Sequence, residues 1–142
     1  MPKPFYFCLA FTILLATIVS SHADNGKKSE DDYNQLLAQS IGGKQEVEHI
    51  YHHAAGQSSI RVDIETQTHV IEGGLDKRSS LDSLQQAIFA AHLTKKKPFI
   101  VIYDTDGIEG RYEYRIRIAA EKTGVGFLRI MERDIASINQ IR

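Results

Sequence analysis

The chain has 142 residues, of which 42% are hydrophobic and 25% are charged, with a formal net charge of −1. This length allows one domain with a single hydrophobic core. The single cysteine, Cys8, excludes a small scaffold held together by disulfides, so the domain must fold by packing alone. Residues 24–73 carry 4 basic and 9 acidic groups, whereas residues 74–142 carry 12 basic and 9 acidic groups. The basic bias of the second half permits a phosphate-bearing partner.

The first 23 residues have the order of an export signal. Lys3 gives a positive start, residues 5–19 are almost wholly apolar, and Ser21 and Ala23 place small residues where a signal peptidase reads them. The apolar run of 15 residues is shorter than the roughly 20 that span a membrane. We therefore expect cleavage near Ala23, no transmembrane segment in the mature chain, and a secreted or periplasmic bacterial protein with a flexible tail at 24–30.

The first half of the mature chain predicts one helix and three strands. Residues 31–41 form the helix, because Leu36, Leu37 and Ile41 fall on one side and Gly42-Gly43 follows. Alternating apolar and polar residues predict strands at 46–51 and 60–65, joined by a turn at 55–58. A third strand at 68–72 is expected to stop at Gly73-Gly74. Such short spacing favours an antiparallel meander.

The second half predicts two further strands and one or two helices. Residues 80–94 read as a helix opened by a Ser79–Asp82 capping box and closed by Lys95–Pro98. The continuous apolar run 99–103 is typical of a strand covered on both faces, and 124–131 reads as another. Residues 108–122 fit a strand or a helix; a crossover to the last strand favours the helix. The expected fold is α/β, a small mixed β-sheet flanked by helices in the order α-βββ-α-β-(α)-β, within a single domain at 31–142.

The segments 46–48, 61–72 and 84–102 together resemble the core of the PD-(D/E)XK nuclease-like superfamily, in particular its small bacterial members. The resemblance covers about half of the mature chain and rests on a pattern rather than on a long signature. It implies a restriction-endonuclease-like core.

The resemblance also implies a metal site for cutting phosphodiester bonds. Such cleavage uses a metal ion that neutralises the phosphate and generates hydroxide near neutral pH, and Mg²⁺ prefers oxygen ligands. Asp63 lies on one expected strand and Glu72 on the next, so a short turn can bring both carboxylates to one Mg or Mn ion. The superfamily pattern adds a preceding acidic ligand and an orienting glutamine on the next helix; the matching residues are Glu46 or Glu48, and Gln85 or Gln86.

The pattern departs from the superfamily at its lysine. The active motif reads acid-any-lysine, whereas this chain reads Glu72-Gly73-Gly74. Lys77 or Arg78, on the loop that follows, can take that place, as migrated lysines do in this superfamily. Alternatively, Asp63 and Glu72 are outward polar residues of a half-buried hairpin.

Other short patterns give weaker indications. Asp104–Gly107 resembles the start of a calcium loop, but Arg115 stands where the twelfth-position glutamate is needed. The histidines lack zinc-site spacing. Tyr103, Tyr112 and Tyr114 can stack on bases, although core and sheet packing explains them more simply.

Two function classes follow from the sequence. In the first, the protein is a secreted Mg- or Mn-dependent nuclease with Asp63 and Glu72 as ligands, Gln85 or Gln86 as orienting residue and Lys77 as the replacement lysine. In the second, catalysis has been lost and the protein is an exported effector or binding module for a phosphate-bearing partner, either nucleic acid or an anionic lipid headgroup. The missing lysine favours the second.

The candidate phosphate-binding residues are Lys77, Arg78, Lys95, Lys96, Lys97, Arg115 and Arg117. Both classes require the two carboxylates to meet.

Overall fold

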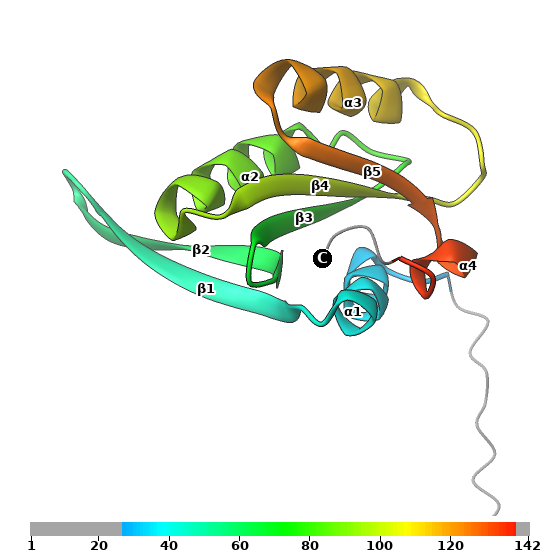
Figure 1. Cartoon of the computed structure of the whole chain (residues 1–142). Coiled ribbons are helices and arrows are strands. Elements are labelled where there is room, and N and C mark those ends of the chain that lie inside the picture. Colours follow the sequence, from blue (N-terminus) through cyan, green and yellow to red (C-terminus); the bar gives the residue numbers. More distant parts are fainter. Residues whose placement is uncertain (1–26, 139–142) are drawn as a thin grey trace, which may run out of the picture.

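The computed structural model of the protein describes residues 27–138, so the expected export signal at 1–23 and the first residues of the expected tail lie outside the described part. Four helices and five strands alternate along it (Figure 1). In chain order they are α1 (Glu30–Ile41), β1 (Lys44–His53), β2 (Gly56–Glu65), β3 (His69–Leu75), α2 (Leu81–Thr94), β4 (Lys97–Asp104), α3 (Arg111–Thr123), β5 (Gly126–Met131) and α4 (Glu132–Ile135). Within residues 27–138, none of the helices has both the length and the apolar character that crossing a bilayer requires.

The five strands form one mixed sheet in the order β1-β2-β3-β4-β5. The pairs β1–β2 and β2–β3 are antiparallel, whereas the pairs β3–β4 and β4–β5 are parallel. Parallel neighbours need crossover connections, and α2 and α3 supply them on one face of the sheet (Figure 1). The other face is covered by α1 and α4. This arrangement confirms the predicted α/β fold and its element order, and residues 111–123 settle the ambiguous segment as a helix.

The central strand β4 is buried on both faces, as its apolar run predicted. Val101 and Tyr103 pack into the core under α1 and α4. Ile100 and Ile102 point the other way and pack beneath α2 and α3. Period-2 alternation therefore distributes one continuous apolar segment between two cores.

The helix starts differ from the expected ones. Ser29 caps α1: its hydroxyl accepts from the N–H of Asp32, while the Asp32 carboxylate accepts from the N–H of Ser29. The helix therefore starts at Glu30, inside the segment predicted to be a loose tail. The predicted capping box at Ser79 and Asp82 is wrong, because α2 starts at Leu81 after Ser80, and Ser80 makes no side-chain cap hydrogen bond.

Gly73 and Gly74 do not end β3, as the sequence suggested, but lie inside it. A Cβ on Gly73 would lie 2.2 Å from Asn34 Oδ1, and one on Gly74 would lie 2.5 Å from Ser80 Oγ. These glycines allow neighbouring elements to approach the strand closely from both faces. The turn was also misplaced: the hairpin reverses at Ala54-Ala55, and Gly56 already belongs to β2.

Candidate functional site

A local break in the β1–β2 hairpin positions the candidate site. Glu46 and Asp63 lie between the pairs Gln45↔Ile64 and Val47↔Val62. Val62 packs beneath α2, whereas Ile64, only two residues later, packs under α1. The regular alternation of the strand therefore shifts by one residue at Asp63, much as in a β-bulge. The partner strand accommodates the shift at Glu46, whose φ of 53° is rare for a residue with a side chain.

The shift directs the Asp63 carboxylate toward β3. The two strands pair only at Ile64↔Ile71 and Glu65↔Val70. Beyond these pairs, the N–H of Gly73 donates a hydrogen bond to Asp63 Oδ2 at 2.8 Å. The Asp63 carboxylate thus accepts the hydrogen bond from the Gly73 N–H that a strand carbonyl would otherwise accept.

Glu72 completes a carboxyl pair with Asp63. It lies in β3 and is only 1% exposed. Burial, then the negative charge of Asp63 and a side-chain hydrogen bond with it, raise the pKa of Glu72 to about 9. The raised pKa means that Glu72 keeps its proton at neutral pH, beside the Asp63 carboxylate. Its Oε1 atom is buried and has no hydrogen-bond partner among the described residues.

The surroundings of the pair are acidic. Burial is the main cause that raises the pKa of Asp63, and the Gly73 N–H partly opposes it. The charges of Glu30 and Glu46 raise the pKa of both Asp63 and Glu72. None of the causes that shift these two pKa values is a basic side chain. The pair thus combines a buried Glu72 with a partly buried Asp63, and no cation is among the groups that shift their pKa values.

A second polar group, from α1 and β4, faces Gly73. Tyr103 donates from its hydroxyl to Asn34 Oδ1 at 2.7 Å, and the ring of Tyr33 stacks on that of Tyr103 with centroids 5.0 Å apart. The Asn34 Nδ2 atom is buried without a partner within residues 27–138. The two buried side-chain atoms without partners, Asn34 Nδ2 and Glu72 Oε1, therefore lie on residues next to Gly73. Asn34 is not among the residues that the sequence predicted for the site; its only signal was the pair of glycines, which indicated a strand end.

The predicted orienting glutamines do not reach the pair. Gln85 and Gln86 are both exposed on α2, and neither makes a side-chain hydrogen bond among residues 27–138. Instead Ser83, one turn earlier, donates from its hydroxyl to the carbonyl of Gly73 at 3.2 Å. Of the two candidate acidic ligands on β1, Glu46 pairs with exposed Arg61, and Glu48 is exposed.

Lys77 lies beside the acidic surroundings of the pair. It is exposed on the loop after β3 and lines a surface cavity of about 380 Å³ together with Glu30. Arg78 lines the same cavity, but its guanidinium pairs with Glu30 at 2.7 Å. The charge of Glu30, which lines this cavity, raises the pKa of both Asp63 and Glu72.

The seven candidate phosphate-binding residues do not form one patch. Lys77 and Arg78 follow the last residue of β3, whereas Lys95–Lys97 lie at the other end of the sheet, where Lys97 pairs with the first residue of β3. Lys96 is partly buried in an ion pair with Glu65. On α3, Arg117 pairs with Glu109, and Arg115 is exposed.

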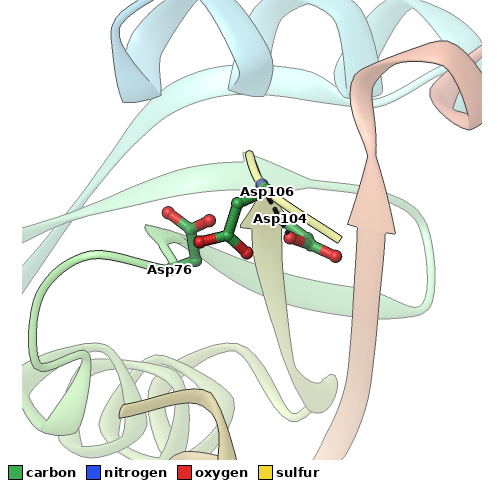
Figure 2. Close-up of side chains that lie close together, drawn as sticks. All are labelled: Asp76, Asp104 and Asp106. Carbon is green, nitrogen blue, oxygen red and sulfur yellow. Dashed lines mark hydrogen bonds between the residues drawn. The ribbon is translucent and has the colours of Figure 1, made fainter. Parts of the chain in front are cut away.

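A separate carboxylate group lies where β3 and β4 end (Figure 2). One oxygen from each of Asp76, Asp104 and Asp106 lies within 4.8 Å of the others, which is close enough to share a metal ion. Each carboxylate already accepts hydrogen bonds, however. Asp76 accepts from Thr105, Asp104 accepts from the N–H groups of Asp106 and Gly107, and Asp106 accepts from the N–H of Ile108.

Asp104 also forms an ion pair with Arg129 at 2.7 Å. These contacts explain the Asp104–Gly107 segment as a turn that the carboxylates stabilise themselves, without the calcium loop its first residues suggested.

The chain was compared with protein family models, with characterised proteins and with solved structures, and none of the three comparisons gives a match.

Proposed function

We propose that this protein is a metal-dependent phosphodiesterase that cleaves nucleic acid, with Asp63 and Glu72 holding Mg²⁺ or Mn²⁺. The observation that carries the proposal is the buried Glu72 Oε1 atom, which has no partner although its carboxyl group lies against a second one. A buried carboxyl without a complete set of partners is costly, and a cation is the partner that two adjacent carboxylates can share.

The donor set fits a hard divalent cation. Both side chains offer oxygen atoms, which Mg²⁺ and Mn²⁺ prefer, and the acidic neighbours Glu30 and Glu46 increase the negative potential at the pair. The pair also lies on β2 and β3 directly before α2, the arrangement that the resemblance to PD-(D/E)XK nucleases implies. That resemblance and the activity it suggests are part of the proposal.

Each residue of the site has a distinct role in this proposal. When bound, the metal supplies a Lewis acid and lowers the pKa of a water molecule. Glu72 must release its proton before a cation binds, so metal affinity rises with pH. Asp63 keeps its orientation through the N–H of Gly73. Lys77, at the cavity beside Glu30, places a positive charge where a phosphate group can approach.

The test is cleavage of plasmid DNA and of RNA by the purified protein in EDTA, Mg²⁺ and Mn²⁺. We expect metal-dependent cleavage that Glu72→Gln and Asp63→Asn abolish and that Lys77→Met reduces. Asp106→Asn is the matched control, because it removes a carboxylate charge from the other acidic group. Cleavage that persists in Glu72→Gln, or that continues in EDTA, would contradict the proposal.

A second function is favoured by the burial of Glu72. With 1% of its surface exposed, this residue is closed to a large substrate in the present conformation. A binding module without catalysis, which recognises nucleic acid or an anionic lipid headgroup through exposed basic residues such as Lys77 and Arg115, fits that closure. If no variant cleaves, DNA and phosphoinositide vesicles should be titrated at two salt concentrations. Binding that does not weaken with salt would exclude phosphate recognition.

A further inference from the structure

We propose that the outer half of the β1–β2 hairpin and the C-terminal half of α2 form a docking surface for single-stranded nucleic acid. The surface binds the strand without metal. The inference rests on the proposed function in one respect: the bound strand is the substrate that is presented to Asp63 and Glu72. It consists of a series of four rings, His53, Tyr51, Phe89 and His92, which we call the ring strip.

The hairpin extends well beyond the strand that supports it. The β1–β2 pairing continues from Lys44↔Glu65 to His53↔Gly56, whereas β2 pairs with β3 only at Ile64 and Glu65. Figure 1 shows the hairpin projecting past the rest of the sheet, with α2 lying over it. An isolated two-stranded ribbon is barely stable in water, so its contact with α2 is what supports this projection.

The ring strip forms that contact. Tyr51 meets Phe89 edge to face, with centroids 4.8 Å apart. At one end His53 lies 6.1 Å from Tyr51, and at the other the ring of His92 lies 6.5 Å from that of Phe89 at an interplanar angle of only 18°. The two histidines are exposed and the two central rings are half-buried. The strip therefore exposes aromatic side chains to solvent, and aromatic side chains are the groups on which unpaired bases stack.

The charge around the strip suits a polyanion. Residues 49–60 and 83–103 contain no aspartate or glutamate. The Lys95 ammonium donates to the carbonyl of His92 at 2.9 Å, which places a positive charge at the end of the strip. The nearby carboxylate of Glu65 is paired with both His49 and Lys96. A phosphate backbone that follows the strip would thus meet the Lys95 ammonium and no carboxylate from these two segments.

The geometry favours a single strand over a duplex. Stacking needs the flat faces of bases, which a duplex hides between neighbouring base pairs. The strip is also aligned with the carboxyl pair along the hairpin. Ser58, the partner of Tyr51, lies five residues before Asp63 on β2, which corresponds to about 17 Å of extended strand. A strand bound on the strip can therefore extend along the hairpin as far as the position of Asp63.

The test is fluorescence anisotropy in EDTA with a labelled oligothymidylate, an abasic oligonucleotide of the same length and charge, and a duplex. We expect the oligothymidylate to bind most tightly. His53→Ala and His92→Ala should each weaken its binding by roughly tenfold, because stacking on one base supplies about that factor.

The matched control is Tyr114→Leu, which removes an exposed ring from α3. Equal affinity for the abasic oligonucleotide, or equal losses in the control, would overturn the ring strip as a base-stacking surface. Tighter binding to anionic vesicles than to the oligonucleotide would overturn it in favour of a membrane partner. Since no metal is present, these outcomes are separate from the cleavage test: Glu72→Gln should lose cleavage and keep binding.

Discussion

The molecule contains two groups of clustered carboxylates that differ in how their charges are satisfied. The first group has three carboxylates, Asp76, Asp104 and Asp106, whose oxygens lie close enough together for a metal. The second group has two, Asp63 and Glu72. Yet each of the three accepts hydrogen bonds from its own loop, and Asp104 also pairs with Arg129. Among residues 27–138, the pair on β2 and β3 accepts from one group outside the pair, the Gly73 N–H, and its surroundings are acidic.

This difference shows that the number of carboxylates alone is a poor guide to a binding site. A carboxylate whose lone pairs already receive N–H and O–H donors stabilises a turn, whereas a buried oxygen without a partner leaves a free-energy cost that a ligand can remove. The same substitution, carboxylate to neutral side chain, should therefore have opposite effects in the two groups.

The largest effect is expected at Asp104. Its side chain is 4% exposed, accepts two backbone N–H groups and pairs with Arg129. Asp104→Ala leaves the two N–H groups without their acceptor and leaves Arg129 with Glu113 as its remaining partner, so we expect the free energy of unfolding to fall by about 3 kcal/mol. Denaturant titration measures it. Asp106→Ala, at the exposed member of the group, should cost under about 1 kcal/mol, and equal losses in both variants would contradict the contrast.

Metal ions should stabilise the protein through the other group. At a Mn²⁺ concentration a hundredfold above the dissociation constant, a site that exists only in the folded state adds about 2.7 kcal/mol to stability. We expect a matching rise in Tm for the wild type at pH 8 that is absent in Glu72→Gln and retained in Asp106→Asn. A rise that disappears only in Asp106→Asn would move the metal to the cluster shown in Figure 2.

Glu72→Gln should also stabilise the metal-free protein at high pH. The folded pKa of about 9 lies above the ordinary value of 4.5, so the folded protein retains a proton that the unfolded chain releases between these pH values. The stability contribution of Glu72 is complete below pH 4.5 and is lost as the pH rises to about 9. Glutamine mimics the protonated form, so the variant should exceed the wild type by about 1–3 kcal/mol at pH 8 and match it near pH 5. Denaturation curves at both pH values measure this difference. A wild type whose stability does not fall over that interval would exclude the raised pKa.

Much of the fold could be predicted from the sequence, because periodicity reports burial. The alternation in β2, the continuous apolar run in β4 and the face of α2 each predicted the correct element. Asp63 and Glu72 could also be placed on adjacent strands from their spacing alone.

What the sequence could not supply depends on contacts between distant segments. The role of Gly73 depends on Asn34, thirty-nine positions earlier, and nothing local distinguishes a glycine that admits a neighbour from one that ends a strand. The alternation shift at Asp63 is similarly invisible, because both flanking residues are apolar and each fits either face. The glutamines on α2 were misjudged for a related reason. Helical phase places Ser83 toward β3 and leaves Gln85 and Gln86 exposed, but that phase is fixed by packing on the sheet.

The smallest effect is expected at the hydrogen bond between Tyr103 and Asn34. Tyr103 donates its hydroxyl hydrogen to Asn34 Oδ1 inside the core, so Tyr103→Phe leaves a buried amide oxygen without its donor and should cost about 1 kcal/mol of stability. If Asn34 also holds the β3 backbone at Gly73 in place, the loosened amide should weaken Mn²⁺ binding slightly while leaving the Asp104 turn unaffected. Isothermal titration with Mn²⁺ measures that change. The matched control is Tyr33→Phe, because within residues 27–138 the Tyr33 hydroxyl makes no hydrogen bond to Asn34 although its ring stacks on that of Tyr103. An unchanged Mn²⁺ affinity in Tyr103→Phe would mean that the polar group on the α1 side of Gly73 stabilises the core alone, and that the metal depends on the carboxyl pair without support from α1.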